Sequence, residues 1–88
     1  MANIASQIKR NRQNEKARQR NQSARSEMKT MARQALEAGD AGDAEVAREA
    51  LRKAQRTIDR AVSAGVLHRN TAARRKSRLG RQVESRLG

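Results

Sequence analysis

The sequence has no cysteine, no proline and no aromatic residue, and each absence excludes a class of structure or chemistry. Without cysteine there is neither a disulfide to staple a small fold nor any thiolate chemistry. Without Phe, Tyr or Trp there is no platform on which single-strand readers of RNA stack bases. Because proline is missing and Ala, Arg, Glu, Gln and Lys are abundant, helix is favoured over strand, and we predict an all-α chain.

Long apolar runs are also missing. No stretch of the sequence is apolar enough to span a bilayer, and the first thirty residues lack the apolar core of a secretory signal. The Arg-rich beginning of the chain has the composition of a mitochondrial transit peptide, but it lacks a regular apolar face. With 88 residues and few large apolar side chains, the chain forms at most one domain, and we expect that domain to be marginally stable in isolation.

The residues needed for catalysis are scarce. The chain has one histidine, no tyrosine and no glycine-rich phosphate loop of recognised form, so no nucleophile has a base and an orienting partner. Asp40 and Asp43 could suggest a metal site, but two carboxylates in a turn without His or Cys are better explained as helix caps. We therefore predict no enzymatic activity, no cofactor, no metal and no small-molecule substrate.

Negative charge is scarce at both ends of the chain. From residue 1 to 38 there are nine Lys or Arg against three Glu, and from 66 to 88 there are seven against one, while residues 39–65 carry five of each sign. Like charges repel and do not help a compact chain to fold, so this excess indicates a polyanionic partner. Nucleic acid is the polyanion that we expect.

Apolar periodicity predicts three helices in a single bundle, at about 6–38, 43–64 and 68–86. Gly39 and Gly65 suit the left-handed residue after a helix, Asp40 or Asp43 can cap the second helix, and Asn70 can cap the third. Short connections imply antiparallel neighbours. The predicted core faces are Ala24, Met28, Met31, Ala32, Ala35 and Leu36; Ala47, Leu51, Ala54, Ile58 and Ala61 or Val62; and Ala72, Leu79, Val83 and Leu87, with Lys76 at the edge.

The first helix is much longer than its partners, so about half of it must project beyond the bundle. Between Lys9 and Ser23 the only apolar residue is Ala17, and at about 100° per residue the cations point in every direction. A helix surrounded by charge suits several RNA segments better than one side of a straight duplex. Its candidate RNA-binding residues are Lys9, Arg10, Arg12, Lys16, Arg18, Arg20 and Arg25.

The third helix carries the densest basic cluster of the chain. Arg forks two hydrogen bonds onto a phosphate, and Lys supplies a point charge. The beginning of this helix also exposes unpaired N–H groups that attract phosphate. His68, Asn70 and Thr71 lie there, where structural capping and RNA contact remain equally open. The candidate RNA-binding residues of this region are His68, Arg69, Asn70, Arg74, Arg75, Lys76 and Arg78.

Two parts of the sequence resemble the bacterial small-subunit ribosomal protein S20 family. Residues 64–79, AGVLHRNTAARRKSRL, are similar to its carboxy-terminal signature, and residues 2–4, 8–10 and 14–21 are similar to its amino-terminal half. The resemblance implies a three-helix bundle with an extended first helix that binds small-subunit ribosomal RNA, supports subunit assembly and has no enzymatic role. It also implies a cytoplasmic, ribosomal location and RNA contacts at Lys9, Arg10, Lys16, Arg18, Arg20, His68, Arg69, Asn70, Arg74, Lys76 and Arg78. Ala32 and Ala35 replace bulkier residues of relatives, which suggests a thinner core.

We therefore expect a structural ribosomal RNA-binding protein that contacts few or no other small-subunit proteins, does not form a homo-oligomer and does not bind membranes. The alternative is a nucleoid-associated protein that coats duplex DNA without sequence preference. A helical adaptor for an acidic protein is a third possibility. A membrane-surface helix is disfavoured, because the basic segment has no Trp, Phe or Leu face to insert.

Overall fold

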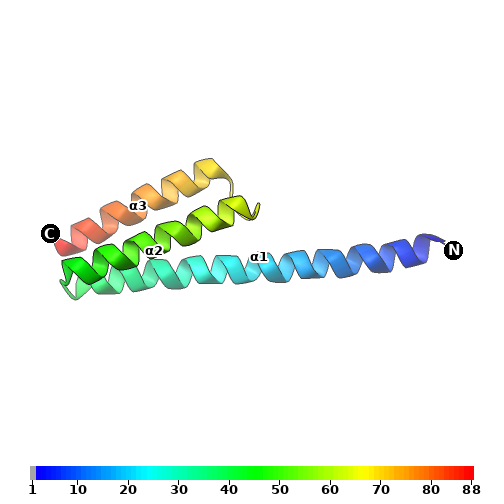
Figure 1. Cartoon of the computed structure of the whole chain (residues 1–88), viewed down its shortest axis with the longest axis horizontal. Coiled ribbons are helices and arrows are strands. Elements are labelled where there is room, and N and C mark those ends of the chain that lie inside the picture. Colours follow the sequence, from blue (N-terminus) through cyan, green and yellow to red (C-terminus); the bar gives the residue numbers. More distant parts are fainter. Residues whose placement is uncertain (1) are drawn as a thin grey trace.

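The computed structural model describes residues 2–88, and for Ala2, Asn3 and Ala5 it describes only the backbone. The chain forms three helices joined by short turns (Figure 1). Helix α1 spans Ala2–Asp40, α2 spans Ala44–Ser63 and α3 spans Arg69–Leu87. α2 runs back along the carboxy-terminal half of α1, and α3 runs antiparallel to α2. The all-α bundle with a long, projecting first helix is thereby confirmed.

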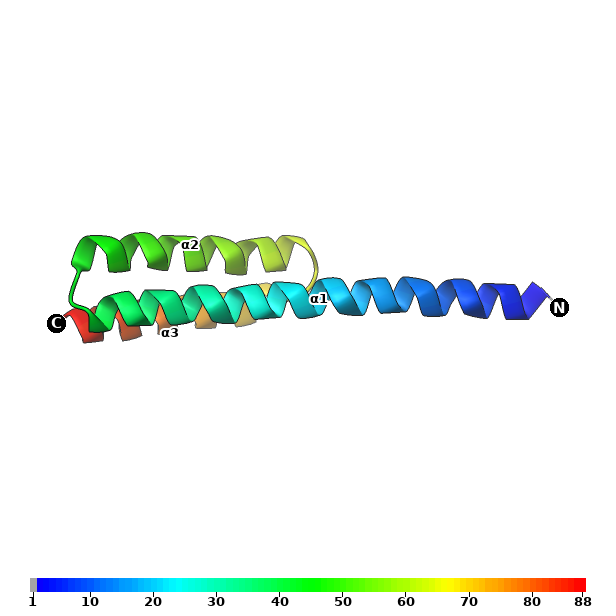
Figure 2. The same cartoon turned by 90° about the horizontal axis from the view of Figure 1, so that it is seen from below.

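The molecule is a rod measuring 65 × 22 × 13 Å. At about 1.5 Å per residue, the 39 residues of α1 span roughly 58 Å, whereas the 20 residues of α2 cover about 30 Å. Figure 2 shows that the amino-terminal half of α1 extends past both partner helices. No helix among residues 2–88 is long and apolar enough to cross a membrane.

The first helix is longer than predicted at both ends. It begins at Ala2 rather than near residue 6, and it continues through Gly39 to Asp40 rather than ending at residue 38. The prediction that Gly39 is the left-handed residue after α1 is therefore wrong. That conformation belongs to Gly42, with φ 78°, whereas the prediction for Gly65, with φ 77°, is confirmed.

Gly39 has a packing role instead. A Cβ at this position would lie 3.2 Å from Cβ of Arg86 and 3.4 Å from the carbonyl oxygen of Val83, so the missing side chain lets α1 approach α3 closely. Asp40, one residue further along α1, receives a hydrogen bond from Arg86 at 2.6 Å. The end of the first helix is therefore fixed by α3, a contact that the local sequence does not encode.

The two shorter helices have side-chain caps at their starts. Asp43 caps α2 and accepts a hydrogen bond from the backbone N–H of Val46, as predicted for one of the two aspartates. The prediction of Asn70 as the cap of α3 is wrong, because His68 takes this position and its Nδ1 accepts from the backbone N–H of Asn70. Each cap satisfies a donor that a helix start leaves without an intrahelical partner.

The core is thin and rich in alanine. The buried apolar side chains form two clusters, one near each end of the bundle, and Val83 is the only large side chain among the described residues that is fully buried. Thr57, which the apolar pattern did not predict, is buried with its hydroxyl bonded to the carbonyl of Lys53. The buried apolar residues are Met28, Ala35, Ala47, Ala54, Ile58, Ala61, Ala72, Leu79 and Val83.

Candidate nucleic-acid interface

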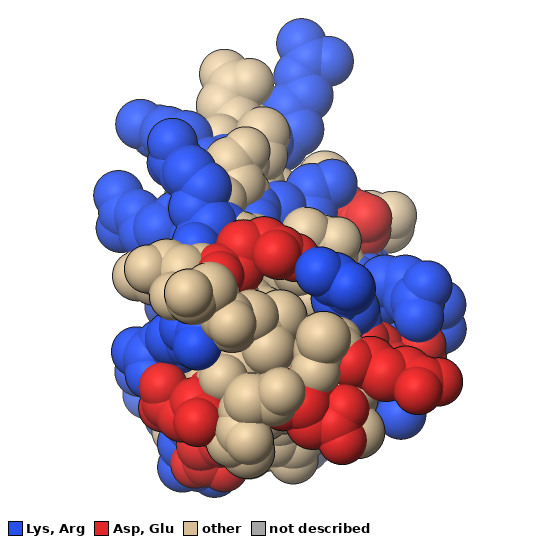
Figure 3. All heavy atoms as spheres, turned by 90° about the vertical axis from the view of Figure 1, so that its left-hand side faces the viewer, with Lys and Arg blue, Asp and Glu red and all other residues tan. Residues whose placement is uncertain are grey.

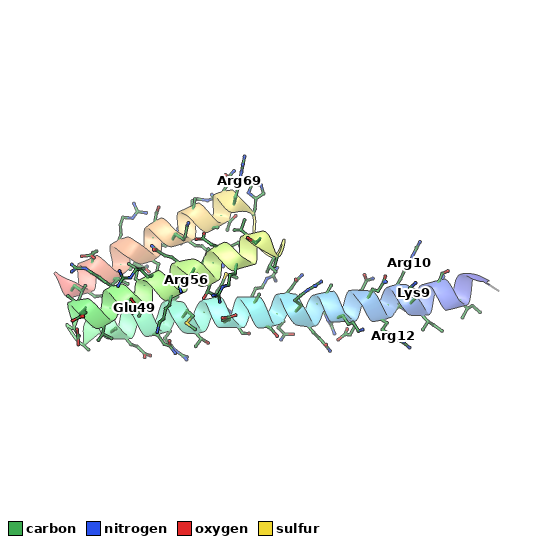
Figure 4. The ribbon with its side chains drawn as sticks, in the orientation of Figure 1. Lys9, Arg10, Arg12, Glu49, Arg56 and Arg69 are labelled. Carbon is green, nitrogen blue, oxygen red and sulfur yellow. The ribbon has the colours of Figure 1, made fainter. Side chains whose placement is uncertain are left out.

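The projecting segment, defined here as residues 6–20 of α1, is exposed at every side chain except Ala17. It has six cations and one acid, and its apolar residue Ile8 is 55% exposed because no other helix covers it. Arg10 and Arg12 leave α1 on opposite sides (Figure 4). The segment thus presents positive charge around its whole circumference.

One cation of this segment is already paired within the helix. Arg18 Nη2 lies 2.8 Å from Glu15 Oε2, and both side chains are largely in solvent. An exposed ion pair of this kind contributes about 0–1 kcal/mol, so a phosphate can replace the carboxylate at little cost. The other candidates of α1 have no acidic partner within 4.0 Å among the described residues: Lys9, Arg10, Arg12, Lys16, Arg20 and Arg25.

Helix α3 presents a second cationic surface. Spacings of four and three residues place Arg74, Arg78 and Arg81 on the side of α3 opposite Ala72, Leu79 and Val83, which face the core. Arg75 and Arg78 also line a groove shared with α1, and Arg69 stands at the beginning of the helix (Figure 4). All five arginines are exposed, and none has an acidic partner among the described residues.

Lys76 differs from the other candidates. Its Nζ lies 2.9 Å from Asp59 Oδ1, its side chain is 35% exposed, and the pair bridges α2 and α3. The prediction that Lys76 lies at the edge of the core face is thus confirmed. Its ammonium group is engaged inside the protein, so it offers less to a phosphate than its arginine neighbours do.

His68 combines a structural role with a free donor. Because Nδ1 accepts the N–H of Asn70 at 3.1 Å, the ring proton of a neutral imidazole must sit on Nε2. The side chain is exposed, so this N–H can donate to an external oxygen. Asn70 and Thr71 lie in the first turn of α3, where Asn70 is exposed and Thr71 is half-buried. The capping role therefore belongs to His68, and Asn70 keeps its side chain for other contacts.

Acidic residues gather at the opposite end of the rod. The end of α1, the α1–α2 turn, the start of α2 and the end of α3 meet there, and Figure 3 shows red side chains over this face. No metal-binding group of three His, Cys, Asp or Glu side chains occurs in the described part of the chain. The acidic residues at this end are Glu37, Asp40, Asp43, Glu45, Glu49 and Glu84.

Sequence reasoning missed several cations. Segment 39–65 has no net charge, yet its acids lie mostly at the start of α2 and its cations further along the helix. A charge count in shorter windows would have found this asymmetry. Lys29 was missed because it lies within the packing part of α1, although it stands across a groove from Arg75 and Arg78. The exposed cations that have neither a predicted role nor an acidic partner among the described residues are Lys29, Lys53, Arg56, Arg60 and Arg81.

Comparison with known proteins identifies a family. The sequence model described as ribosomal protein S20 matches residues 2–84 of this chain. The "small ribosomal subunit protein bS20" of Beutenbergia cavernae is 60% identical over 83 residues, which cover 94% of this chain and 96% of that protein. The protein of the same name in Streptomyces griseus is 56% identical, covering 97% of both chains. That of Corynebacterium efficiens is 56% identical, covering 92% of this chain and 93% of the relative.

Proposed function

The chain belongs to the ribosomal protein S20 family, and from this premise we propose that it binds small-subunit ribosomal RNA directly and stabilises the RNA fold during assembly. As a family member it is a structural constituent of the small subunit of the bacterial, cytoplasmic ribosome and is not an enzyme. The proposed contacts run from Lys and Arg side chains to phosphates. They involve the projecting segment of α1 and the exposed arginines of α3, which are Arg69, Arg74, Arg75, Arg78 and Arg81.

The projecting segment is the observation that supports this proposal most strongly. A helix that is polar all round has no partner of its own, and here no other helix of the bundle covers residues 6–20. Its six cations compete for one carboxylate, that of Glu15. Phosphates on several sides would supply both the missing charges and the missing neighbours.

The proposed mechanism is electrostatic bridging. RNA segments that approach one another repel through their phosphates, and a cation between two segments lowers this repulsion on both sides. A rod 65 Å long, whose projecting segment has positive charge around its circumference, can reach several segments at once. Because no aromatic side chain is available for base stacking, the contacts are made to phosphates, sugars and RNA shape.

A salt titration tests the mechanism. Affinity of the protein for small-subunit ribosomal RNA, measured by filter binding, should fall steeply as salt rises. The logarithm of the binding constant should fall with the logarithm of salt concentration with a slope of about −0.9 for each phosphate neutralised, the value for a duplex. Duplex DNA at equal phosphate concentration serves as the competitor. A flat salt response contradicts the mechanism, and equal preference for duplex DNA favours the DNA-coating alternative.

A pair of charge-matched variants tests the α3 surface. Replacing Arg74, Arg75 and Arg78 with Ala should reduce RNA affinity while helix content, followed by circular dichroism, stays unchanged. The matched control replaces Arg33, Arg48 and Arg52 with Ala. It removes the same amount of charge, but from side chains that are already paired with carboxylates. Equal loss of affinity in both variants would show that only net charge matters.

We propose further that the protein acts as a monomer with few or no contacts to other small-subunit proteins. Most of its surface cations are committed to RNA in this scheme, and like-charged copies repel one another. Sedimentation equilibrium of the free protein should therefore give the mass of one chain, 9.8 kDa.

A further inference from the structure

A groove between α1 and α3 combines an apolar floor with a cationic rim. Met28, Ala32 and Leu36 of α1 line it together with Leu79 of α3, and Ile58 of α2 lies at its base. The groove has a volume of about 190 Å³. Such a site accepts a narrow ligand rather than a whole helix.

The rim carries positive charge on both walls. Lys29 stands on the α1 wall, and Arg75 and Arg78 stand on the α3 wall, without a carboxylate among the lining residues. None of the three cations has an acidic partner within 4.0 Å among the described residues. The lining is completed by Gln82, whose exposed amide can donate or accept.

The groove on the other side of α1 makes an informative contrast. It lies between α1 and α2 and also has apolar residues, Met31, Val46 and Ala50, but its charged lining is balanced by two acids and two cations. Both grooves are therefore partly apolar, and only the α1–α3 groove has an uncompensated charge. Charge complementarity selects an anionic occupant for this groove and not for its neighbour.

We propose that one sugar–phosphate strand of the RNA lies along the α1–α3 groove, with ribose C–H faces on the apolar floor and phosphates on the two walls. This inference rests on the proposed function and names the place where one strand is held. An inserted base fits less well, since the floor offers no polar group for the edge of a base. Such an edge would be left without partners on burial.

The test places one carboxylate in each groove. Gln82→Glu adds a negative charge to the α1–α3 groove, and the control Gln34→Glu adds the same charge to the α1–α2 groove, both at exposed helical positions. Neither change removes an apolar contact of the core. Circular dichroism melts of both variants verify that the bundle is intact.

With small-subunit ribosomal RNA, Gln82→Glu should weaken binding about tenfold, the loss expected for one charge-assisted contact, whereas Gln34→Glu should change it less than about twofold. Hydroxyl-radical footprinting should show a run of riboses protected by the unaltered protein and by Gln34→Glu. That run should become reactive with Gln82→Glu, while dimethyl sulfate modification of the same bases stays unchanged.

Three outcomes overturn the inference and leave the proposed function standing. Equal affinities of the two variants would mean that the groove is not occupied by an anion. Ribose protection that survives Gln82→Glu would place the strand elsewhere, and base protection that depends on Gln82 would show an inserted base. Failure of the unaltered protein to bind the RNA would instead overturn the proposed function itself.

Discussion

Glycines show how differently one residue type is used in this chain. Gly42 and Gly65 have positive φ values and turn the backbone after a helix, whereas Gly39 lies inside α1 and lets α3 pack closely against it. Gly80 serves neither purpose. It sits within α3 without positive φ, and a Cβ there would meet only Gln55 Nε2, at 3.9 Å. Helical glycine without a packing role is a cost in conformational entropy.

Gly80→Ala should therefore raise the free energy of unfolding by about 0.5–1 kcal/mol, the difference in helix propensity between the two residues. Gly42→Ala should lower it by about 1 kcal/mol or more, because alanine resists the left-handed conformation. Urea denaturation followed by circular dichroism measures both. A loss of stability in Gly80→Ala would mean that α3 packs more tightly on Gln55 than the structure shows.

His68 allows structure and recognition to be separated. His68→Ala removes the cap of α3 and should lower the free energy of unfolding by about 0.5–2 kcal/mol. His68→Asn keeps a good capping side chain, so it should retain stability yet weaken RNA binding by losing the Nε2 donor. Thermal melts and filter binding on the same preparations measure the two effects. If His68→Asn keeps full RNA affinity, the imidazole only caps α3 and does not contact the RNA.

At the scale of the element, the two halves of α1 have different reasons to be helical. From Asn21 onward the helix has half-buried or buried side chains on one face, whereas residues 6–20 have only Ala17 partly covered. Most helical stability in proteins comes from packing of an apolar face. The projecting segment lacks this support, and its cations repel one another within the same helix.

We therefore expect the projecting segment to be only partly helical in the free protein and to become fully helical on RNA. Amide hydrogen exchange should be fast for residues 6–20 without RNA and slow in the complex, while amides around Val83 stay protected in both. The control is the free protein at high salt, where screening reduces the repulsion between cations. Strong protection of residues 6–20 without RNA would contradict this expectation.

At the scale of the whole molecule, charge is polarised along the rod. The amino-terminal end of α1 has cations with almost no acids, and the opposite end collects six of the nine acidic side chains. Arg86 and Arg48 are bound there to Asp40 and Glu84, so they hold helices together rather than attract a partner. Such a rod has one end with uncompensated positive charge, which attracts RNA phosphates, and one end where acids offset the cations, which does not.

This polarity predicts how the protein sits on its RNA. Because the chain has no cysteine, Ile8→Cys and Ala41→Cys each provide a single attachment point for an iron chelate, one at either end of the rod. Cleavage of small-subunit ribosomal RNA should be strong from position 8 and weak from position 41. Equally strong cleavage from both positions would show that the acidic end is also enclosed by RNA.

The sequence by itself determined what depends on neighbours along the chain. The missing proline and the spacing of Met28, Ala35, Leu79 and Val83 are sufficient for an all-α bundle, because residues three and four apart share a helix face. The lack of apolar residues before Asn21 likewise predicts that the first helix projects. Asp43, one of the two predicted caps, and Gly65 are confirmed, because capping and left-handed turns depend on neighbouring residues.

Only the tertiary structure decided what depends on contacts between distant segments. Gly39 lies inside α1 and packs against α3, although its place after the last apolar residues of the helix is typical of a glycine that ends one. Lys76 is held by Asp59 of another helix, and Lys29 faces Arg75 although 46 positions separate them in the chain. Charges are fixed by the sequence, but the direction in which each points is set by packing, and direction governs which of them an RNA strand can reach.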